Sequence, residues 1–141
     1  ETNADGEKAP ELRAEMQKIM QSCFGIFRNG EDMARGIKEL EALRPRVENV
    51  GLADSSKAFN TARIEALELQ NLFETAEATA YTAIARTESR GAHSREDFSE
   101  RDDENWLLHS MYWGEGNKVG TRDVNMTPKT VPTFEPKVRT Y

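Results

Sequence analysis

Apolar residues recur every three or four positions in three separate stretches of this chain, and that periodicity is the strongest limit on its fold. Such spacing places side chains on one face of an α-helix. The first stretch begins at Pro10, because the first turn of a helix tolerates proline, and ends at Asn29-Gly30. Its apolar face is predicted to contain Leu12, Met16, Ile19, Met20, Cys23 and Phe27.

The second stretch predicts a helix over residues 31–50, with Glu31 and Asp32 at its positive N-terminal end. Pro45 conflicts with this prediction, because a proline inside a helix removes a hydrogen bond and costs about 3 kcal/mol. We therefore expect a kink near residues 41–43, or a helix that breaks and restarts there.

The third stretch predicts the longest helix, over residues 60–87, capped by Asn60 or Thr61. Short connections favour antiparallel neighbours, so the predicted fold is mainly α, with an antiparallel three-helix bundle over residues 10–88. The residues expected to face inward on the third helix are Ile64, Leu67, Leu72, Phe73, Ala76, Ala80 and Ile84.

The two ends of the chain differ from the bundle. Residues 1–9 are polar, lack a starting Met and are predicted to be a disordered linker cut from something longer. Residues 89–141 are expected to be an extended C-terminal tail that packs on the bundle or on a partner. Within the tail, an aromatic-rich extended segment over residues 106–113, a turn-like segment over 114–120 and a returning strand that starts at Thr121 indicate a candidate β-hairpin over residues 106–126.

Composition excludes several classes of function. The 141 residues suit one domain, and the net charge of −6 disfavours binding to nucleic acid. Apolar runs are far shorter than the ~20 residues of a membrane span, so no direct membrane insertion is expected. The single cysteine, Cys23, excludes an internal disulfide and a multi-cysteine zinc site, and a buried thiol is the favoured interpretation.

The segment after the third helix contains the residues best suited to catalysis or ligand binding. A histidine such as His93 titrates near neutrality and could shuttle protons, but no nucleophile or acid nearby in sequence is placed as its catalytic partner. Arg90 and Arg95 could bind a carboxylate, although pairs with Glu88, Glu96, Asp102 or Asp103 are a stronger interpretation. The acidic residues 102–104 with His109 lack a second histidine, which favours a solvated acidic run over a metal site.

Two motifs in this region resemble a known family. The run Arg86-Thr-Glu-Ser-Arg-Gly-Ala-His-Ser-Arg95 is similar to a signature of succinate dehydrogenase and fumarate reductase flavoprotein subunits, and Arg101-Asp-Asp-Glu-Asn-Trp106 resembles the following segment in bacterial succinate dehydrogenases. Further agreement extends the resemblance over residues 12–141 and lies in residues 27–33, 59–63, 124–126 and 136–141.

The resemblance implies the C-terminal helical domain of such a subunit. Parent enzymes oxidise succinate to fumarate with FAD and pass electrons through an iron–sulfur subunit to quinone, peripherally on the cytoplasmic side of the bacterial inner membrane. The family's FAD-linking and substrate-binding residues lie upstream and none maps onto this chain. We therefore expect no catalytic residue, no cofactor and no metal here, and the chain alone is expected to be inactive.

The expected role is that of a scaffold that contacts the flavin-binding and capping domains of the same polypeptide, and through them the iron–sulfur subunit. The alternatives are the same domain of a fumarate reductase or an L-aspartate oxidase, a free-standing helical interaction module, or a small enzyme that uses His93 or His109. The candidate interdomain contacts are Arg86, Arg90, Gly91, His93, Arg95 and Trp106.

Overall fold

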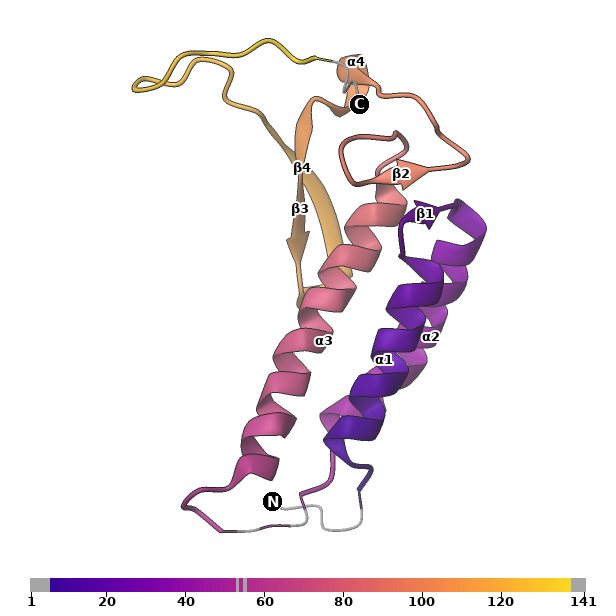
Figure 1. Cartoon of the computed structure of the whole chain (residues 1–141), viewed down its shortest axis with the longest axis vertical. Coiled ribbons are helices and arrows are strands. Elements are labelled where there is room, and N and C mark those ends of the chain that lie inside the picture. Colours follow the sequence, from indigo (N-terminus) through magenta and orange to yellow (C-terminus); the bar gives the residue numbers. More distant parts are fainter. Residues whose placement is uncertain (1–5, 53, 55, 138–141) are drawn as a thin grey trace.

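Three long helices form the body of the chain in the computed structural model, which describes residues 6–52, 54 and 56–137. They are α1 (Ala9–Cys23), α2 (Gly30–Glu48) and α3 (Thr61–Ala85). The three helices run in alternating directions side by side, which confirms the predicted antiparallel three-helix bundle (Figure 1). Asn29 and Asn60 cap α2 and α3 by accepting hydrogen bonds from Asp32 N and Arg63 N, both at 2.8 Å.

The core lies where the three helices meet. On α3, alternating steps of three and four residues define the buried face. Ile64 and Leu67 fall outside this face and are 55% and 53% exposed, and Leu72 lies at its edge with 45% exposed. Predicting these three residues as inward-facing was wrong, because another apolar stripe contacts α1 and α2. That stripe consists of Ala66, Leu69, Phe73, Ala76, Ala80 and Ala83.

The first helix ends earlier than predicted. After Cys23 the chain makes a tight turn at Gly25, where a Cβ atom would lie 2.7 Å from Gln21 O. It then enters the short strand β1 (Phe27–Arg28), which pairs in parallel with β2 (Ser94–Arg95). Phe27 was predicted on the apolar helix face, but on this strand it is 72% exposed.

Pro45 does not break α2, which continues from Gly30 to Glu48. The proline lies in the last turn of the helix, so only one hydrogen bond, to the carbonyl of Glu41, is lost. Asn49 closes the helix through its backbone N–H (3.1 Å) and its side-chain Nδ2 (2.7 Å), both of which donate to Pro45 O. The predicted break and restart was therefore wrong.

Gly36 marks a close approach between α1 and α2. A Cβ atom at this position would lie 2.5 Å from Cys23 Cβ and 2.5 Å from a ring carbon of Phe24. Both neighbours are buried, as is the glycine itself. The absence of a side chain at residue 36 is therefore what lets the end of α1 rest against α2.

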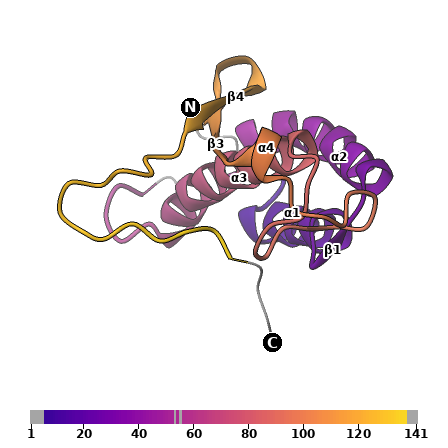
Figure 2. The same cartoon turned by 90° about the horizontal axis from the view of Figure 1, so that it is seen from above.

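The tail forms the predicted hairpin beyond a short helix, α4 (Asp103–Trp106), that the sequence did not suggest. Strands β3 (Leu108–Trp113) and β4 (Lys118–Asp123) pair antiparallel around the short 3-10 turn Glu115–Asn117. The returning strand thus begins three residues before the expected Thr121. Beyond β4 the chain loops out to one side of the bundle and comes back (Figure 2), and Arg101 Nη1 donates a hydrogen bond to Lys137 O near the end of this segment (2.5 Å).

The hairpin is held on α3 by aromatic and polar contacts. The rings of Tyr81 and Tyr112 stack with their centroids 6.3 Å apart. Asn117, in the hairpin turn, accepts a hydrogen bond from Tyr112 Oη (2.6 Å) and donates one to Tyr81 Oη (3.2 Å). The turn itself is therefore fixed to the middle of the bundle.

At the other end, residues 1–5 of the predicted disordered linker lie outside the described residues. The prediction does not hold for residues 7–9. Glu7 accepts two hydrogen bonds from Arg46, at 2.6 and 2.8 Å, and Ala9 already belongs to α1. Among the helices of the described ranges, none has both the length and the apolar character that a membrane span requires.

Candidate interdomain joint

Residues 86–106, here called the joint, cross the end of the bundle where α3 ends and α2 begins. Arg95 is 3% exposed and donates to the carbonyls of Ile84 (3.2 Å) and Arg86 (3.1 Å) at the negative end of α3. It also forms two hydrogen bonds of 2.7 Å with Asp97. Asp97 in turn accepts from Gly30 N at the positive end of α2 (2.8 Å). One ion pair therefore links the opposite dipole ends of two helices.

Asp97 is stabilised in its charged form by this arrangement. The Arg95 guanidinium, together with the hydrogen bond from Gly30 N, holds the pKa of the Asp97 carboxyl well below its usual range. Asp97 is therefore charged at neutral pH, where it attracts both Arg95 and the positive end of α2.

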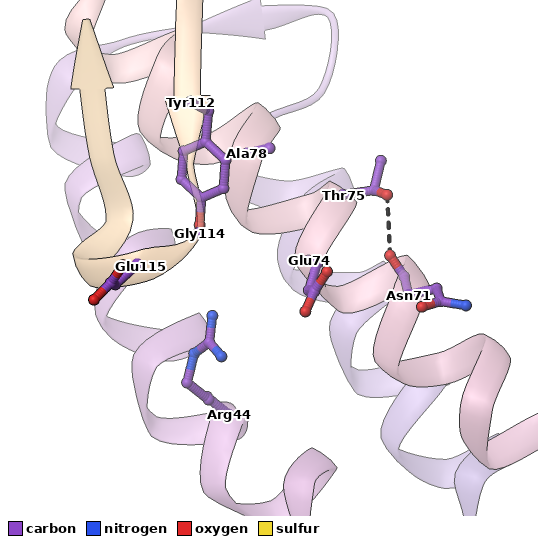
Figure 3. A pocket seen from close by; sticks show the side chains of 8 residues that line it. All are labelled: Arg44, Asn71, Glu74, Thr75, Ala78, Tyr112, Gly114 and Glu115. Carbon is purple, nitrogen blue, oxygen red and sulfur yellow. Dashed lines mark hydrogen bonds between the residues drawn. The ribbon is translucent and has the colours of Figure 1, made fainter.

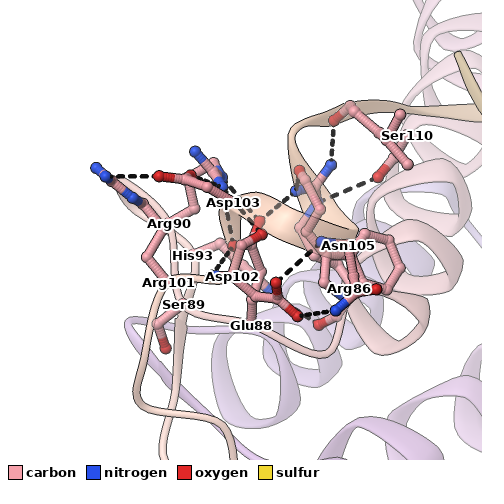
Figure 4. Close-up of polar contacts among 12 residues, drawn as sticks. Arg86, Glu88, Ser89, Arg90, His93, Arg101, Asp102, Asp103, Asn105 and Ser110 are labelled. Atoms are coloured by element: carbon pink, nitrogen blue, oxygen red, sulfur yellow. Dashed lines mark hydrogen bonds and ion pairs between the residues drawn. The ribbon is translucent and has the colours of Figure 1, made fainter. Parts of the chain in front are cut away.

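A second group of charges, the Glu88 network, comprises Arg86, Glu88, Arg90, Asp102 and Asp103 (Figure 4). Glu88 is completely buried. It accepts hydrogen bonds from Arg86 (2.5 Å), from Arg90 Nε (2.8 Å) and Nη2 (3.1 Å), and from Asp102 N (2.8 Å). Burial alone would raise the pKa of Glu88, but the hydrogen bonds from Arg90, Asp102 N and Arg86 outweigh it and lower the pKa.

Arg86 connects the network to the tail. It donates to the carbonyls of Trp106 (3.0 Å) and Leu108 (2.5 Å) and to the hydroxyl of Ser110 (3.3 Å). Its guanidinium also lies 5.0 Å from the centre of the Trp106 ring, and the indole N–H of Trp106 donates to Thr87 Oγ1 (3.0 Å). Arg86 thus fastens α4 and β3 to the end of α3.

His93 is half-buried beside Arg28, a residue of β1. His93 Nδ1 lies 2.9 Å from Arg28 Nη1, and Nε2 lies 3.2 Å from Arg86 O. A guanidinium can only donate, so Nδ1 accepts and Nε2–H donates, which defines a neutral ring. Burial, and then the charges of Arg28 and Arg95, lower the pKa of His93. Gly91 (φ +59°) forms the turn that brings His93 back to Arg90.

The lowered pKa of His93 predicts a pH-dependent stability. In the unfolded chain this histidine titrates near 6.5. Below that pH the unfolded state binds a proton that the folded state does not, so the free energy of unfolding falls as the pH drops from 7.5 to 5.5. Urea titrations at both pH values measure the change. His93→Gln should remove it and His109→Gln should keep it, and equal pH dependence in the wild type and His93→Gln would contradict the prediction.

Most of the residues predicted as interdomain contacts form hydrogen bonds or ion pairs within this chain. The predicted pairs of Arg90 with Glu88 and Asp103 are confirmed, whereas Arg95 pairs with Asp97 and not with Glu96. The acidic run is not simply solvated, because Asp102 caps α4 and Asp103 binds two arginines. Arg28 lies within residues 27–33, which carry part of the family resemblance, but nothing in the sequence indicated its contact with His93. The spacing of residues 86, 88 and 90 could have indicated side chains on one side of an extended segment.

A polar cavity of about 670 Å³ lies apart from the joint, between α3 and the hairpin (Figure 3). Arg44 reaches into it from α2, and Glu74, Tyr112 and Glu115 also line it. Arg44 is ion-paired with Glu77, a completely buried carboxylate on the inner face of α3. The spacing of apolar residues gave no indication of a carboxylate buried on this face.

Comparison with known proteins places these features in a family. Residues 13–141 match the family described as the fumarate reductase flavoprotein C-terminal region. The chain is 52% identical over 128 residues to the succinate dehydrogenase flavoprotein subunit of Coxiella burnetii, and the match covers 91% of this chain and 22% of that protein. The fumarate reductase flavoprotein subunit of Mycobacterium tuberculosis is 37% identical over 136 residues, which cover 96% of this chain and 23% of that protein.

A solved structure supports the same assignment. Quinol fumarate reductase of E. coli superposes with a TM-score of 0.80 at 36% identity, over 95% of this chain and 24% of that one. The chain therefore spans less than a quarter of the length of each of these relatives. Together, the sequence match and the shared helical fold show that this chain belongs to the succinate dehydrogenase and fumarate reductase flavoprotein family, in its C-terminal region.

Proposed function

We propose that the chain serves as the C-terminal helical domain of a succinate dehydrogenase flavoprotein subunit. The parent would oxidise succinate to fumarate with FAD and pass electrons through an iron–sulfur subunit to quinone, peripherally on the cytoplasmic side of the bacterial inner membrane. The observation that carries this proposal is the 52% identity to a succinate dehydrogenase subunit, against 37% for the fumarate reductase subunit of M. tuberculosis. A fumarate reductase is the second candidate, favoured by the match to E. coli quinol fumarate reductase.

The flavin would be held elsewhere in the subunit, because the glycines of this region do not form a dinucleotide-binding loop. Such a loop needs glycines between a strand and the N-terminus of a helix. Gly30 does follow β1 at the start of α2, but β1 has two residues and Gly30 is not part of a Gly-x-Gly-x-x-Gly run. Gly114 and Gly116 lie in the hairpin turn, Gly120 lies in β4, and Gly91 lies in the turn before His93. We therefore assign this chain a supporting role and no step of the redox chemistry.

The support would be given by a rigid joint and by the outer face of α3. Ile64, Leu67 and Leu72 are about half exposed on this helix, on a side that also carries the exposed Glu68 and Asn71 and continues through the uncharged Thr75 and Thr79. Exposed apolar residues that gather on one face commonly mark an interaction surface. Arg86, Arg90, Gly91, His93, Arg95 and Trp106 would hold the neighbouring end of the domain in position against the flavin-binding and capping domains.

Removing the tail tests the scaffold role. A full-length subunit that ends at Thr87 lacks β2, the Glu88 network and the hairpin. It should lose bound flavin, assembly with the iron–sulfur subunit and succinate-dependent reduction of an artificial acceptor, because the ion pairs of Glu88 and Arg95 at the end of α3 are then missing. Flavin content, co-purification and acceptor reduction are the measurements. Full retention of flavin and assembly would refute the scaffold role.

A substitution on α3 tests the outer face separately. Leu67→Glu should change the free energy of unfolding of the 141-residue chain by less than about 0.5 kcal/mol, because the side chain is already exposed. In the full-length subunit the same change should lower flavin content and succinate oxidation, because a charge would be buried against the other domains. Gln70→Glu, an equal charge at another exposed position of α3, is the control. Equal activities of the two variants would contradict the proposed surface.

A further inference from the structure

The four arginines of the joint and Arg28 of the adjacent strand β1 do not all have a carboxylate partner. Four of the five form ion pairs, and these are Arg86 with Glu88, Arg90 with Glu88 and Asp103, Arg95 with Asp97, and Arg101 with Asp103. Arg28 forms no ion pair with any carboxylate in the described ranges of the chain. Among the described residues, Arg28 is therefore the one arginine of this group whose guanidinium contacts no carboxylate.

The Arg28 guanidinium is nevertheless held in one orientation. Its Nε donates to the carbonyls of Phe24 (3.1 Å) and Gly25 (2.9 Å), where α1 has just ended. Its Nη1 donates to His93 Nδ1 (2.9 Å). Its Nη2 has no hydrogen-bond partner among the residues that the structure describes. A fixed, partly buried guanidinium with a free donor is prepared to bind an anion with little loss of side-chain entropy.

This guanidinium lines a small cavity of about 200 Å³. The cavity is also lined by a second guanidinium, an imidazole that the geometry defines as neutral, and hydroxyl groups, and no acidic side chain lines it among the residues that the structure describes. Liquid water takes about 30 Å³ per molecule, so the space is that of a few waters and suits one carboxylate group. The other lining residues with polar side chains are Arg86, His93, Thr79, Thr82 and Ser110.

We propose that the cavity between Arg28, Arg86 and His93 binds one carboxylate, with Arg28 as the main partner. The free Nη2 donor of Arg28 can bind one carboxylate group, and the cavity has room for it. The planar fork of arginine also matches the two oxygens of a carboxylate. The same group is carried by an aspartate or glutamate of a docked protein segment and by a small organic acid. The site stands on this chain's own residues and does not rest on the proposed enzyme activity.

The binding test uses the 141-residue chain labelled for NMR. Sodium acetate is titrated against sodium chloride at equal ionic strength, and the resonances of the His93 ring and of Arg28 Nε are followed. Acetate should cause saturable shifts that chloride does not, and should raise the pKa of His93 by about one pH unit, because a nearby anion favours the charged ring. Equal responses to acetate and chloride, no response to acetate, or tighter binding of inorganic phosphate would overturn the proposal.

Matched variants assign the site. Arg28→Gln should weaken acetate binding about tenfold, as expected for the loss of a charged hydrogen-bond donor. Arg63→Gln removes an equal charge from an arginine that also has no ion pair in the described ranges, and it should bind acetate as the wild type does. If Arg28→Gln does not fold, the wild-type comparison of acetate with chloride still decides the proposal. Equal acetate binding by both variants would overturn it.

The source of the carboxylate is distinguished in the full-length subunit with only these 141 residues labelled. If His93 has a raised pKa there and no longer responds to acetate, a side-chain carboxylate from another part of the protein fills the cavity. If the response to acetate persists, the ligand is a small acid, and succinate is compared with acetate next. Both results support a carboxylate site. An unchanged His93 pKa together with no response to acetate in the full-length subunit would contradict it.

Discussion

Replacing Glu88 with alanine should lower the free energy of unfolding by about 3–5 kcal/mol, the range measured when one partner of a buried ion pair is removed. Glu88 is completely buried and accepts hydrogen bonds from Arg86, Arg90 and Asp102 N. Without the carboxylate, two guanidinium groups keep their positions but lose their shared counterion. The energetic cost is largest at Arg86, because its side chain is only 13% exposed and is therefore poorly solvated.

Urea unfolding of the 141-residue chain at pH 7.5 measures the effect. Glu96→Ala is the control, since Glu96 lies in the same segment, is exposed and has no ion pair in the described part of the chain. It should stay within about 0.5 kcal/mol of the wild type. A loss below about 1 kcal/mol for Glu88→Ala would show that the Glu88 network contributes little to stability.

Gly36→Ala should destabilise the chain by about 1–3 kcal/mol, although alanine is the better helix former. The added methyl group would lie 2.5 Å from Cys23 Cβ and 2.5 Å from the Phe24 ring, both buried. Neither neighbour can move freely, because each belongs to the core between the end of α1 and α2. The helices would have to separate, and the clash outweighs the gain in helix propensity.

Gly114→Ala is the matched control for this substitution. Gly114 has a φ of −60°, which alanine adopts without strain, and a Cβ atom there would meet nothing within 4 Å. The control should be neutral or stabilising by about 0.4–1 kcal/mol, because alanine restricts the unfolded chain more than glycine does. Thermal and urea unfolding of both variants provide the comparison. A stability of Gly36→Ala equal to or above that of the wild type would contradict the inferred close approach.

Periodicity predicted the three helices and the hairpin, but it could not decide which apolar stripe of α3 is covered. Ile64, Leu67 and Leu72 are as apolar as the true core residues, and only the positions of α1 and α2 exclude them. Phe27 fitted the spacing of α1 but follows the turn at Gly25. The sequence therefore indicates that α3 has an apolar face, whereas the residues that become buried depend on where α1 and α2 pack against it.

The joint was predictable only where its partners are close in sequence. Arg90 and Glu88 are two residues apart, and their pairing was expected. Arg28 contacts His93 across 65 residues, and Gly30 contacts Asp97 across 67. Local pattern carries no information on such distant pairs, because the folded bundle brings them together. For the same reason the candidate carboxylate cavity could not be seen in the sequence.

The parallel pairing of β1 with β2 has a consequence for the order of folding. It connects Phe27 with Ser94 and Arg28 with Arg95, so it closes a loop that contains both α2 and α3. Closing so long a loop is entropically unfavourable until the helices within it have formed and packed. The pairing therefore belongs to a late stage of folding. Substitutions in β1 or β2 should therefore change mainly the unfolding rate, and with it the lifetime of the folded state.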